Sequence, residues 1–305
     1  MQALARASIA AVLVLLAACG AAGPDTAVPD RKTIVVTYSI LGSVVKDLVG
    51  DRANVIVPMP NGQDPHEWSP SAQDIAVFNR ADLVVQNGLG LEGGLEKTLQ
   101  QAHSSGVRFF TASDYITVRK VGPGEGLPGG GPDQAVGADD PHLWMDPLAM
   151  KQVELALAGK LHTELGIDVS ARAADLAGRL DSLNREIAAA VAGLPAANRN
   201  LVTGHESMGY FAQRYGFRLV GAIIPGLSTQ AQVSASDLAA LKKQIETYRV
   251  KAVFTELGTS PAVAQAVGRE TGVKVVELST HVLPADGSYF TFMRNAAHTI
   301  IDNLK

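Results

Sequence analysis

The feature that most constrains the fold is an alternation of short apolar runs, rich in β-branched residues, with longer stretches of helical period. Runs that are apolar along their whole length are typical of parallel strands buried on both faces. Four runs lie in each half of the chain, at residues 33–38, 54–59, 82–87, 108–113, 200–204, 218–224, 252–257 and 274–279. This pattern predicts an α/β fold of two similar (β/α)4 domains with parallel sheets.

One long amphipathic helix is predicted between the two sets of runs. Its apolar stripe recurs at spacings of three and four, at Leu176, Leu180, Leu183, Ile187, Val191 and Leu194. Pro195 is expected to end it. A helix of about 25 residues is about 37 Å long, which is enough to bridge two domains rigidly, although a coiled-coil partner would explain the same stripe. We therefore expect an N-terminal α/β domain at 33–166, a linking helix at 167–196 and a C-terminal α/β domain at 197–305.

The N-terminus has the pattern of an export signal. Residues 1–18 contain one arginine followed by an apolar run that is too short to span a bilayer as a helix. The small residues before Cys19 resemble a bacterial lipobox, although an ordinary signal peptide with a chance cysteine would give the same letters. Cys19 is the only cysteine, so no internal disulfide is expected. The prediction is a signal peptide at 1–18 and a lipid-anchored tether at 19–32, at the outer face of the cytoplasmic membrane or in the periplasm.

Composition excludes some partners and identifies one irregular segment. The formal net charge of −4 argues against nucleic acid as a partner. Residues 121–140 are rich in glycine and proline and predict a loop without regular structure. This loop contains no histidine. It either gates the cleft predicted below or is an inert connecting segment.

The histidines fall into two groups once the strands are placed. Three of the seven lie in stretches of helical period, at positions 103, 162 and 298, and are expected to be packing or surface residues. The other four follow predicted strands: His66, His142, His205 and His281. Ligands of doubly wound α/β domains bind at the carboxyl ends of the strands, so these four are predicted to converge on one cleft. A set of neutral imidazoles favours a borderline ion such as zinc over magnesium or calcium.

A repeated phrase surrounds two of these histidines. DPHEWSP begins at Asp64 and DPHLWMDP at Asp140, so His66 and His142 each lie between a proline and a tryptophan. Proline restricts its own φ and the residue before it, which limits the freedom of the ligand. We expect Trp68 and Trp144 to point away from the metal in an extended chain and to form a dry wall beneath it. A turn with a core tryptophan is the alternative for each copy.

Three motifs together resemble a known family. DPHEWSPSAQDI, PHLWMDP and VTGHESMGYFAQRYGF are similar to the ligand motifs of the cluster A-I metal-binding solute-binding lipoproteins of zinc and manganese ABC importers. The resemblance implies two α/β domains bridged by the long helix, with the metal between them. It also implies metal ligands at His66, His142 and His205, and an ABC permease with its ATPase as partners.

The third and fourth ligand positions bear on which metal is bound. Family members that prefer manganese tend to have glutamate at the third position and zinc members histidine, so His205 favours Zn2+. The family usually has aspartate at the fourth position. Here His281 lies nearest and is the predicted ligand, with Asp286 as the alternative. Glu67, Glu206 and Glu256 are candidates to support the ligands from behind, although each could instead be a solvated or capping residue.

The sequence thus predicts an extracytoplasmic zinc-binding protein, with Zn2+ as transported ligand and no enzymatic activity. It is expected to be a monomer that delivers zinc to an ABC importer. A manganese or iron importer subunit is the first alternative. A zinc hydrolase is the second, since three histidines with an open water position are also a catalytic arrangement, although no HExxH motif is present. A surface adhesin is the third.

Overall fold

All eight predicted runs form strands. The computed structural model describes residues 31–125 and 135–305. The predicted signal peptide, the tether up to residue 30 and the lipidation site Cys19 lie outside the described residues. So do residues 126–134, which are part of the irregular loop at 121–140. The described ends of that loop are joined by an isolated antiparallel bridge between Lys120 and Asp139.

The first half of the chain forms one parallel sheet. Strands β1 (Thr33–Val36), β2 (Asn54–Ile56), β3 (Leu83–Gln86) and β4 (Phe109–Thr111) lie in the order β2-β1-β3-β4. All three pairings are parallel. The connection from β1 runs to β2 on one side and that from β3 runs to β4 on the other, so the topological switch point lies between β1 and β3, where this architecture places its crevice. The helical segments of this half are α1 (Ser39–Val49), α2 (Ala72–Phe78), η1 (Gly93–Leu95), α3 (Glu96–Ser104) and η2 (Ala112–Tyr115).

The second half contains two pairs of parallel strands. β5 (Asn200–Thr203) pairs with β6 (Arg218–Ala222), and β7 (Ala252–Thr255) pairs with β8 (Lys274–Glu277). β5 and β7 are in contact but belong to separate hydrogen-bonded sheets. The expected four-stranded sheet is therefore split between its two central strands. The helices of this half are η5 (Ala196–Asn198), α6 (Gly209–Tyr215), α7 (Ala235–Thr247), α8 (Pro261–Thr271) and α9 (Tyr289–Leu304).

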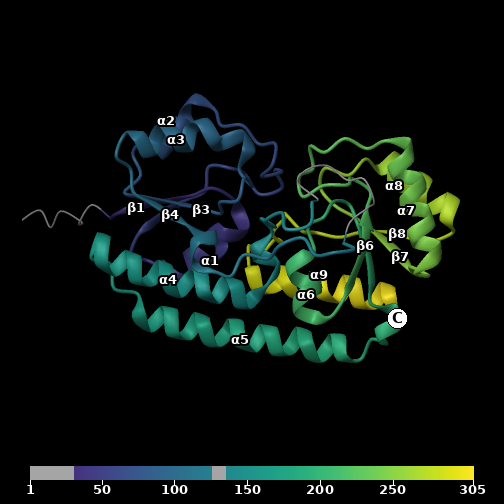
Figure 1. The fold of residues 1–305 in the computed structure, drawn as a ribbon. Helices are drawn as coiled ribbons and strands as arrows, with labels where there is room; N and C mark the ends of the chain where they lie inside the picture. Colours follow the sequence, from purple (N-terminus) through teal and green to yellow (C-terminus); the bar gives the residue numbers. More distant parts are fainter. Residues whose placement is uncertain (1–30, 126–134) are drawn as a thin grey trace, which may run out of the picture. The chain divides into compact units, whose positions relative to one another are not determined.

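The predicted long helix is α5 (Ser170–Ala192), which ends three residues before Pro195. Its predicted apolar stripe is buried. The stripe is covered within the same chain, since α5 contacts α4 (Pro147–Leu165), α1, α9 and α6, as can be followed in Figure 1. The stripe is therefore not available to a coiled-coil partner. Residues Lys32–Lys305 form one compact unit, and the division into two domains with a linking helix stays a prediction.

The α/β class with parallel sheets is confirmed. One hydrophobic core runs from β1 through α4 and α5 to α9 and includes Ile34, Leu157, Leu180 and Ile300. Among residues 31–125 and 135–305, no helix has both the length and the apolar character needed to cross a membrane.

Glu154 is an unusual residue of α4 because its carboxyl group is buried without a partner. The residue is 1% exposed, and neither carboxylate oxygen has a hydrogen-bond partner within residues 31–125 and 135–305. Burial raises its pKa to about 8, against a partial lowering by Lys151. The folded protein therefore holds this proton more tightly than the unfolded chain. Stability is lost as pH rises from the unfolded pKa of about 4.5 towards 8.

Replacing Glu154 by methionine is expected to stabilise the protein in a pH-dependent way. At pH 8 the free energy of unfolding should rise by on the order of 2 kcal/mol, because the cost of the buried carboxylate is removed. At pH 4.5 the gain should be small. Urea denaturation at both pH values measures the difference. Glu164→Met is the control, since that carboxylate pairs with Lys160 at the surface of the same helix. An equal gain at both pH values would contradict the argument.

Candidate metal centre

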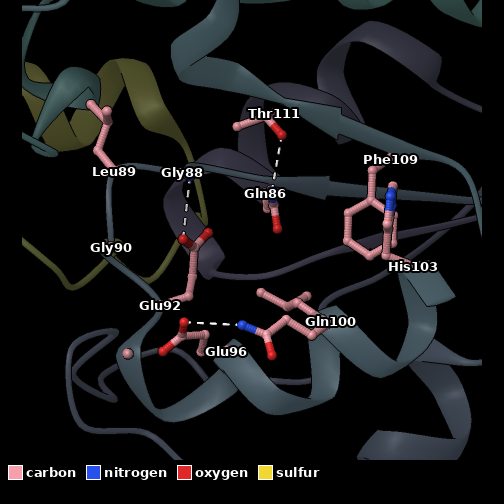
Figure 2. Close-up of a pocket in the computed structure, with 12 residues that line it drawn as sticks. Gln86, Gly88, Leu89, Gly90, Glu92, Glu96, Gln100, His103, Phe109 and Thr111 are labelled. Atoms are coloured by element: carbon pink, nitrogen blue, oxygen red, sulfur yellow. Dashed lines mark hydrogen bonds between the residues drawn. The ribbon is translucent and has the colours of Figure 1, made fainter.

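One surface pocket lies at the edge of the first sheet, and none of the four histidines that follow strands lines it. This pocket of about 550 Å3 lies beside the ends of β3 and β4 (Figure 2). Its polar groups are already paired: the Gln86 amide donates to the Thr111 hydroxyl at 2.9 Å, and the Gln100 amide donates to Glu96 at 3.1 Å. The His103 ring packs on Phe109 with centroids 5.4 Å apart. This histidine therefore has the packing role expected from the sequence.

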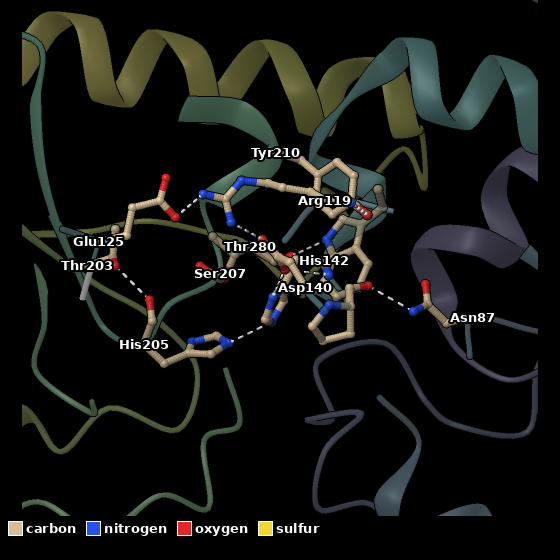
Figure 3. Close-up of polar contacts among 12 residues, drawn as sticks. Asn87, Arg119, Glu125, Asp140, His142, Thr203, His205, Ser207, Tyr210 and Thr280 are labelled. Atoms are coloured by element: carbon tan, nitrogen blue, oxygen red, sulfur yellow. Dashed lines mark hydrogen bonds and ion pairs between the residues drawn. The ribbon is translucent and has the colours of Figure 1, made fainter. Parts of the chain in front are cut away.

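The four histidines that follow strands lie together. One ring nitrogen from each of His66, His142, His205 and His281 can be chosen so that all four atoms are within 4.8 Å of one another. The Nε2 atoms of His142 and His205 are 3.1 Å apart (Figure 3). The four residues are between 0% and 4% exposed. Two come from each half of the chain, as the sequence predicted.

Asp286, the alternative fourth ligand, does not belong to this cluster. It is exposed and lies at the start of α9. Its Oδ1 accepts the backbone N–H of Ser288 at 3.0 Å, and its Oδ2 accepts the hydroxyl of Thr291 at 2.7 Å. The carboxylate thus organises the first turn of a helix. The geometry therefore favours His281 over Asp286 as the fourth ligand.

The repeated DPH phrase builds the same turn twice. The Oδ1 of Asp64 accepts the backbone N–H of His66 at 2.9 Å, and the Oδ1 of Asp140 accepts that of His142 at 3.0 Å. The intervening proline has no N–H, so each aspartate fixes the backbone of the histidine two residues later. The phrase is therefore a device for holding an imidazole on a short, stiff turn.

The chain after each histidine is not extended, so that expectation was wrong. The carbonyl of Asp64 accepts the N–H of Trp68 at 2.9 Å, which closes a turn. After His142 the chain enters a short 3-10 helix, η4 (Leu143–Met145). The chain therefore turns directly after each histidine, where proline has no influence because it restricts only its own φ and the residue before it.

The two tryptophans have different surroundings. Trp144 is fully buried, and its ring lies 5.3 Å from the centroids of both the His142 and the His281 rings. Its indole N–H donates to the carbonyl of Thr280 at 2.9 Å. Trp144 therefore walls the cluster, but it faces the imidazoles rather than pointing away from them. Trp68 is partly buried and packs against the hydrophobic core.

Three side chains orient the imidazoles from behind. The Nδ1 of His142 lies 2.8 Å from Asp140, and that of His281 lies 2.9 Å from the Thr280 hydroxyl. The Thr280 hydroxyl itself donates to Glu256 at 2.6 Å, so its oxygen is left to accept from His281. The Nδ1 of His205 is 3.2 Å from Glu256. The hydrogen bonds at His142 and His281 favour a proton on Nδ1 and leave Nε2 as the donor atom for a metal, whereas the contact at His205 is a charge contact without hydrogen-bond geometry.

Burial and charge set the protonation of the imidazoles. Burial, together with the neighbouring rings, holds the pKa of His66 and that of His281 well below the usual value. Burial also lowers the pKa of His142, against the opposing effect of Asp140. At His205 burial is outweighed by the charge of Glu256, and the pKa is raised. Since the neutral base is the form that binds metal, three of the four rings are already in the binding form near neutral pH.

The acidic residues named from the sequence separate into three cases. Glu67 is exposed. Burial raises the pKa of Glu206 to about 7, and this residue directly follows His205. Glu256 is buried and accepts from the Gly204 N–H at 2.9 Å and the Ser207 hydroxyl at 2.6 Å, in addition to Thr280. Glu256 contacts the cluster through the Nδ1 of His205.

Two supporting residues were missed by the sequence reasoning. Asp140 could have been found, because it begins the DPH phrase that contains His142. Thr280 had no such signal beyond its place beside His281. A residue far away in the sequence also contacts the cluster: the Gln230 side-chain amide donates to the carbonyl of His66 at 2.9 Å.

Comparison with known proteins agrees with this architecture. The family model described as zinc-uptake complex component A, periplasmic (ZnuA), matches residues 34–303. The high-affinity zinc uptake system protein ZnuA of Bacillus subtilis (strain 168) is 30% identical over 289 residues, which cover 89% of this chain and 86% of that protein. The manganese-binding lipoprotein MntA of Halalkalibacterium halodurans is 27% identical, over 97% of this chain and 96% of that one.

A solved structure shows the same fold. The periplasmic zinc-binding protein TroA from Treponema pallidum matches with a TM-score of 0.78 and 25% identity, over 90% of this chain and 99% of that one. The matches extend over both halves of the chain. This chain belongs to the ZnuA family of metal-binding, substrate-binding components of ABC importers.

Proposed function

We propose that this protein captures Zn2+ outside the cytoplasmic membrane and delivers it to an ABC permease driven by its ATPase. The proposed ligands are His66, His142, His205 and His281. The observation that carries the proposal is the convergence of four buried imidazoles within 4.8 Å. Four nitrogen donors arranged around one point match the coordination number and ligand type of zinc.

The donor set supports zinc over manganese. The cluster consists of four imidazoles and contains no carboxylate. Manganese is better suited by carboxylate and water oxygens, whereas imidazole suits zinc. A carboxylate is nearby at Glu256, but it is bound to Ser207 and Thr280 and stands behind His205. The similarity to a zinc uptake protein at 30% identity points the same way.

The hydrolase alternative receives little support. The family is one of transporter components rather than enzymes. Four protein ligands would also fill the tetrahedral shell of zinc and leave no position for an activated water. The remaining parts of the proposal are a lipid anchor on Cys19 and a monomeric protein. The lipid anchor is supported by the lipobox-like residues before Cys19 and by the lipoprotein among the relatives.

Metal titration of chelator-treated protein tests the proposal. We expect one Zn2+ per chain and zinc affinity at least about 100-fold above that for Mn2+, following the general order for nitrogen donors. Competition among Zn2+, Mn2+ and Fe2+ with a coloured chelator gives the ratio. Tighter binding of Mn2+ or Fe2+ would overturn the zinc assignment in favour of the first alternative. Zinc-dependent turnover of ester or peptide substrates would instead favour the hydrolase.

A further inference from the structure

A buried arginine, Arg119, binds Asp140, and Asp140 in turn contacts the ring of His142. Arg119 is 7% exposed, and its guanidinium Nη1 donates to the Oδ2 of Asp140 at 3.0 Å. Asp140 is fully buried. Its other oxygen, Oδ1, faces the Nδ1 of His142 at 2.8 Å (Figure 3). Arginine, aspartate and histidine thus form a continuous chain of contacts that ends at the cluster.

The backbone fixes both ends of this chain. The carbonyl of Arg119 accepts the N–H of Asp140 at 2.9 Å, so the two residues are held together independently of their side chains. The second guanidinium nitrogen, Nη2, donates to Glu125, which also accepts the N–H of Gly122 at 3.0 Å. The planar fork of arginine therefore spans two carboxylates, which a lysine ammonium could not do with the same geometry.

The same pair is packed against the segment that follows His205. The N–H of Arg119 donates to the hydroxyl of Tyr210 at 3.0 Å. A Cβ atom at Gly209 would lie 2.1 Å from the Oδ2 of Asp140 and 2.4 Å from the Nη1 of Arg119. Glycine is therefore required for α6 to approach the ion pair this closely. The arrangement ties the support of one candidate ligand to the helix that begins just after another.

The two oxygens of Asp140 have different partners, and this division explains what Arg119 contributes. Oδ1 accepts the backbone N–H of His142 at 3.0 Å as well as facing its ring, and the guanidinium adds a partner for Oδ2 that opposes rotation of the carboxylate. With Oδ2 held by the guanidinium, Oδ1 stays directed at the imidazole Nδ1. A proton on Nδ1 leaves Nε2 as the free donor, and a charged acceptor behind the ring increases its basicity towards a metal.

We propose that Arg119 is a positioning residue for metal binding, which acts through Asp140 to hold His142 with Nε2 directed at the ion. This inference rests on the proposed function, since it assigns His142 as a ligand. Arg119 does not touch the ion. Its role is to fix one tautomer and one orientation of a ring that does.

The test uses Arg119→Met in the full mature chain, with two readouts. Zinc affinity is measured by competition and is expected to fall by about 10-fold, at the lower end of the effect of groups that support a ligand. Nitrogen-15 spectra of the His142 ring in metal-free protein are expected to change from a single tautomer to a mixture. Arg119→Gln is the second variant. It also removes the charge, but its amide can fill part of the polar site if the methionine variant does not fold.

Arg214→Met is the matched control. Arg214 makes a two-pronged ion pair with Asp146, at 2.9 and 2.6 Å, in the same DPHLWMDP motif, but this pair does not reach His142. It should leave both zinc affinity and the His142 ring spectrum unchanged. If the variants of Arg119 behave like Arg214→Met in both readouts, the proposal is overturned. If wild-type protein fails to bind zinc, the function assigned above fails, while the ring spectrum still decides the role of Arg119.

Discussion

Replacing His281 by alanine is expected to lower zinc affinity by more than about 100-fold, whereas Asp286→Ala should leave it nearly unchanged. Loss of a ligand exceeds the roughly 10- to 100-fold cost of losing a group that stands behind one. The Nε2 of His281 is buried and has no hydrogen-bond partner among the described residues, as expected for a nitrogen that is available to bind a metal ion. Competition titration of both variants beside wild-type protein gives the comparison.

Asp286→Ala is the matched control for this prediction. Its carboxylate binds Ser288 and Thr291, so its removal should cost about 1 kcal/mol of helix stability rather than metal. The opposite pattern, with metal lost only in Asp286→Ala, would show that the fourth ligand is the aspartate. Equal losses in both variants would indicate that the start of α9 and the loop before it move together on binding.

Of the substitutions proposed for this protein, Trp144→Ala should lower stability the most, by about 3–5 kcal/mol in the free energy of unfolding of metal-free protein. The side chain is fully buried and packs on Tyr38 at 5.2 Å as well as on the two imidazoles. Its removal leaves a cavity and deprives the carbonyl of Thr280 of its donor. Urea denaturation in the presence of chelator measures the effect without a contribution from bound ion.

Trp144→Phe separates the two parts of this effect. Phenylalanine keeps an aromatic ring against His142 and His281 but has no N–H for Thr280. We expect a loss of about 1–2 kcal/mol, from one buried hydrogen bond and a smaller cavity. A loss below about 1 kcal/mol for Trp144→Ala would mean that the surrounding side chains collapse into the space. In that case Trp144 would not be a rigid wall of the site.

The strands and the meeting of the histidines could be predicted for the same physical reason. Buried parallel strands need apolar residues on both faces, and this leaves a continuous signal such as residues 33–36 or 252–255. Once strands are placed, their carboxyl ends define where loop residues gather. That rule requires no knowledge of side-chain contacts, so it brought His66, His142, His205 and His281 to one place from the sequence alone.

The supporting contacts could not be predicted because they depend on distances between segments far apart in sequence. Thr280 and Glu256 are 24 residues apart, and Arg119 and Asp140 are 21 residues apart across an irregular loop. Composition and periodicity carry no signal for such pairs. The extended backbone expected after each histidine was wrong because proline restricts only itself and the residue before it, whereas the following residues close a turn or enter a 3-10 helix. The separation of the second sheet into two pairs likewise depends on spacing between β5 and β7.

The near-complete burial of the four imidazoles has a kinetic consequence. A zinc ion bound as proposed, among rings that are at most 4% exposed, would exchange with water only when the enclosing segments open. Its residence time is then set by the opening frequency of the surrounding chain, including the loop whose Gln230 reaches across to His66. A receiving permease would accelerate unloading by prying this enclosure apart, rather than by offering better ligands than the carrier.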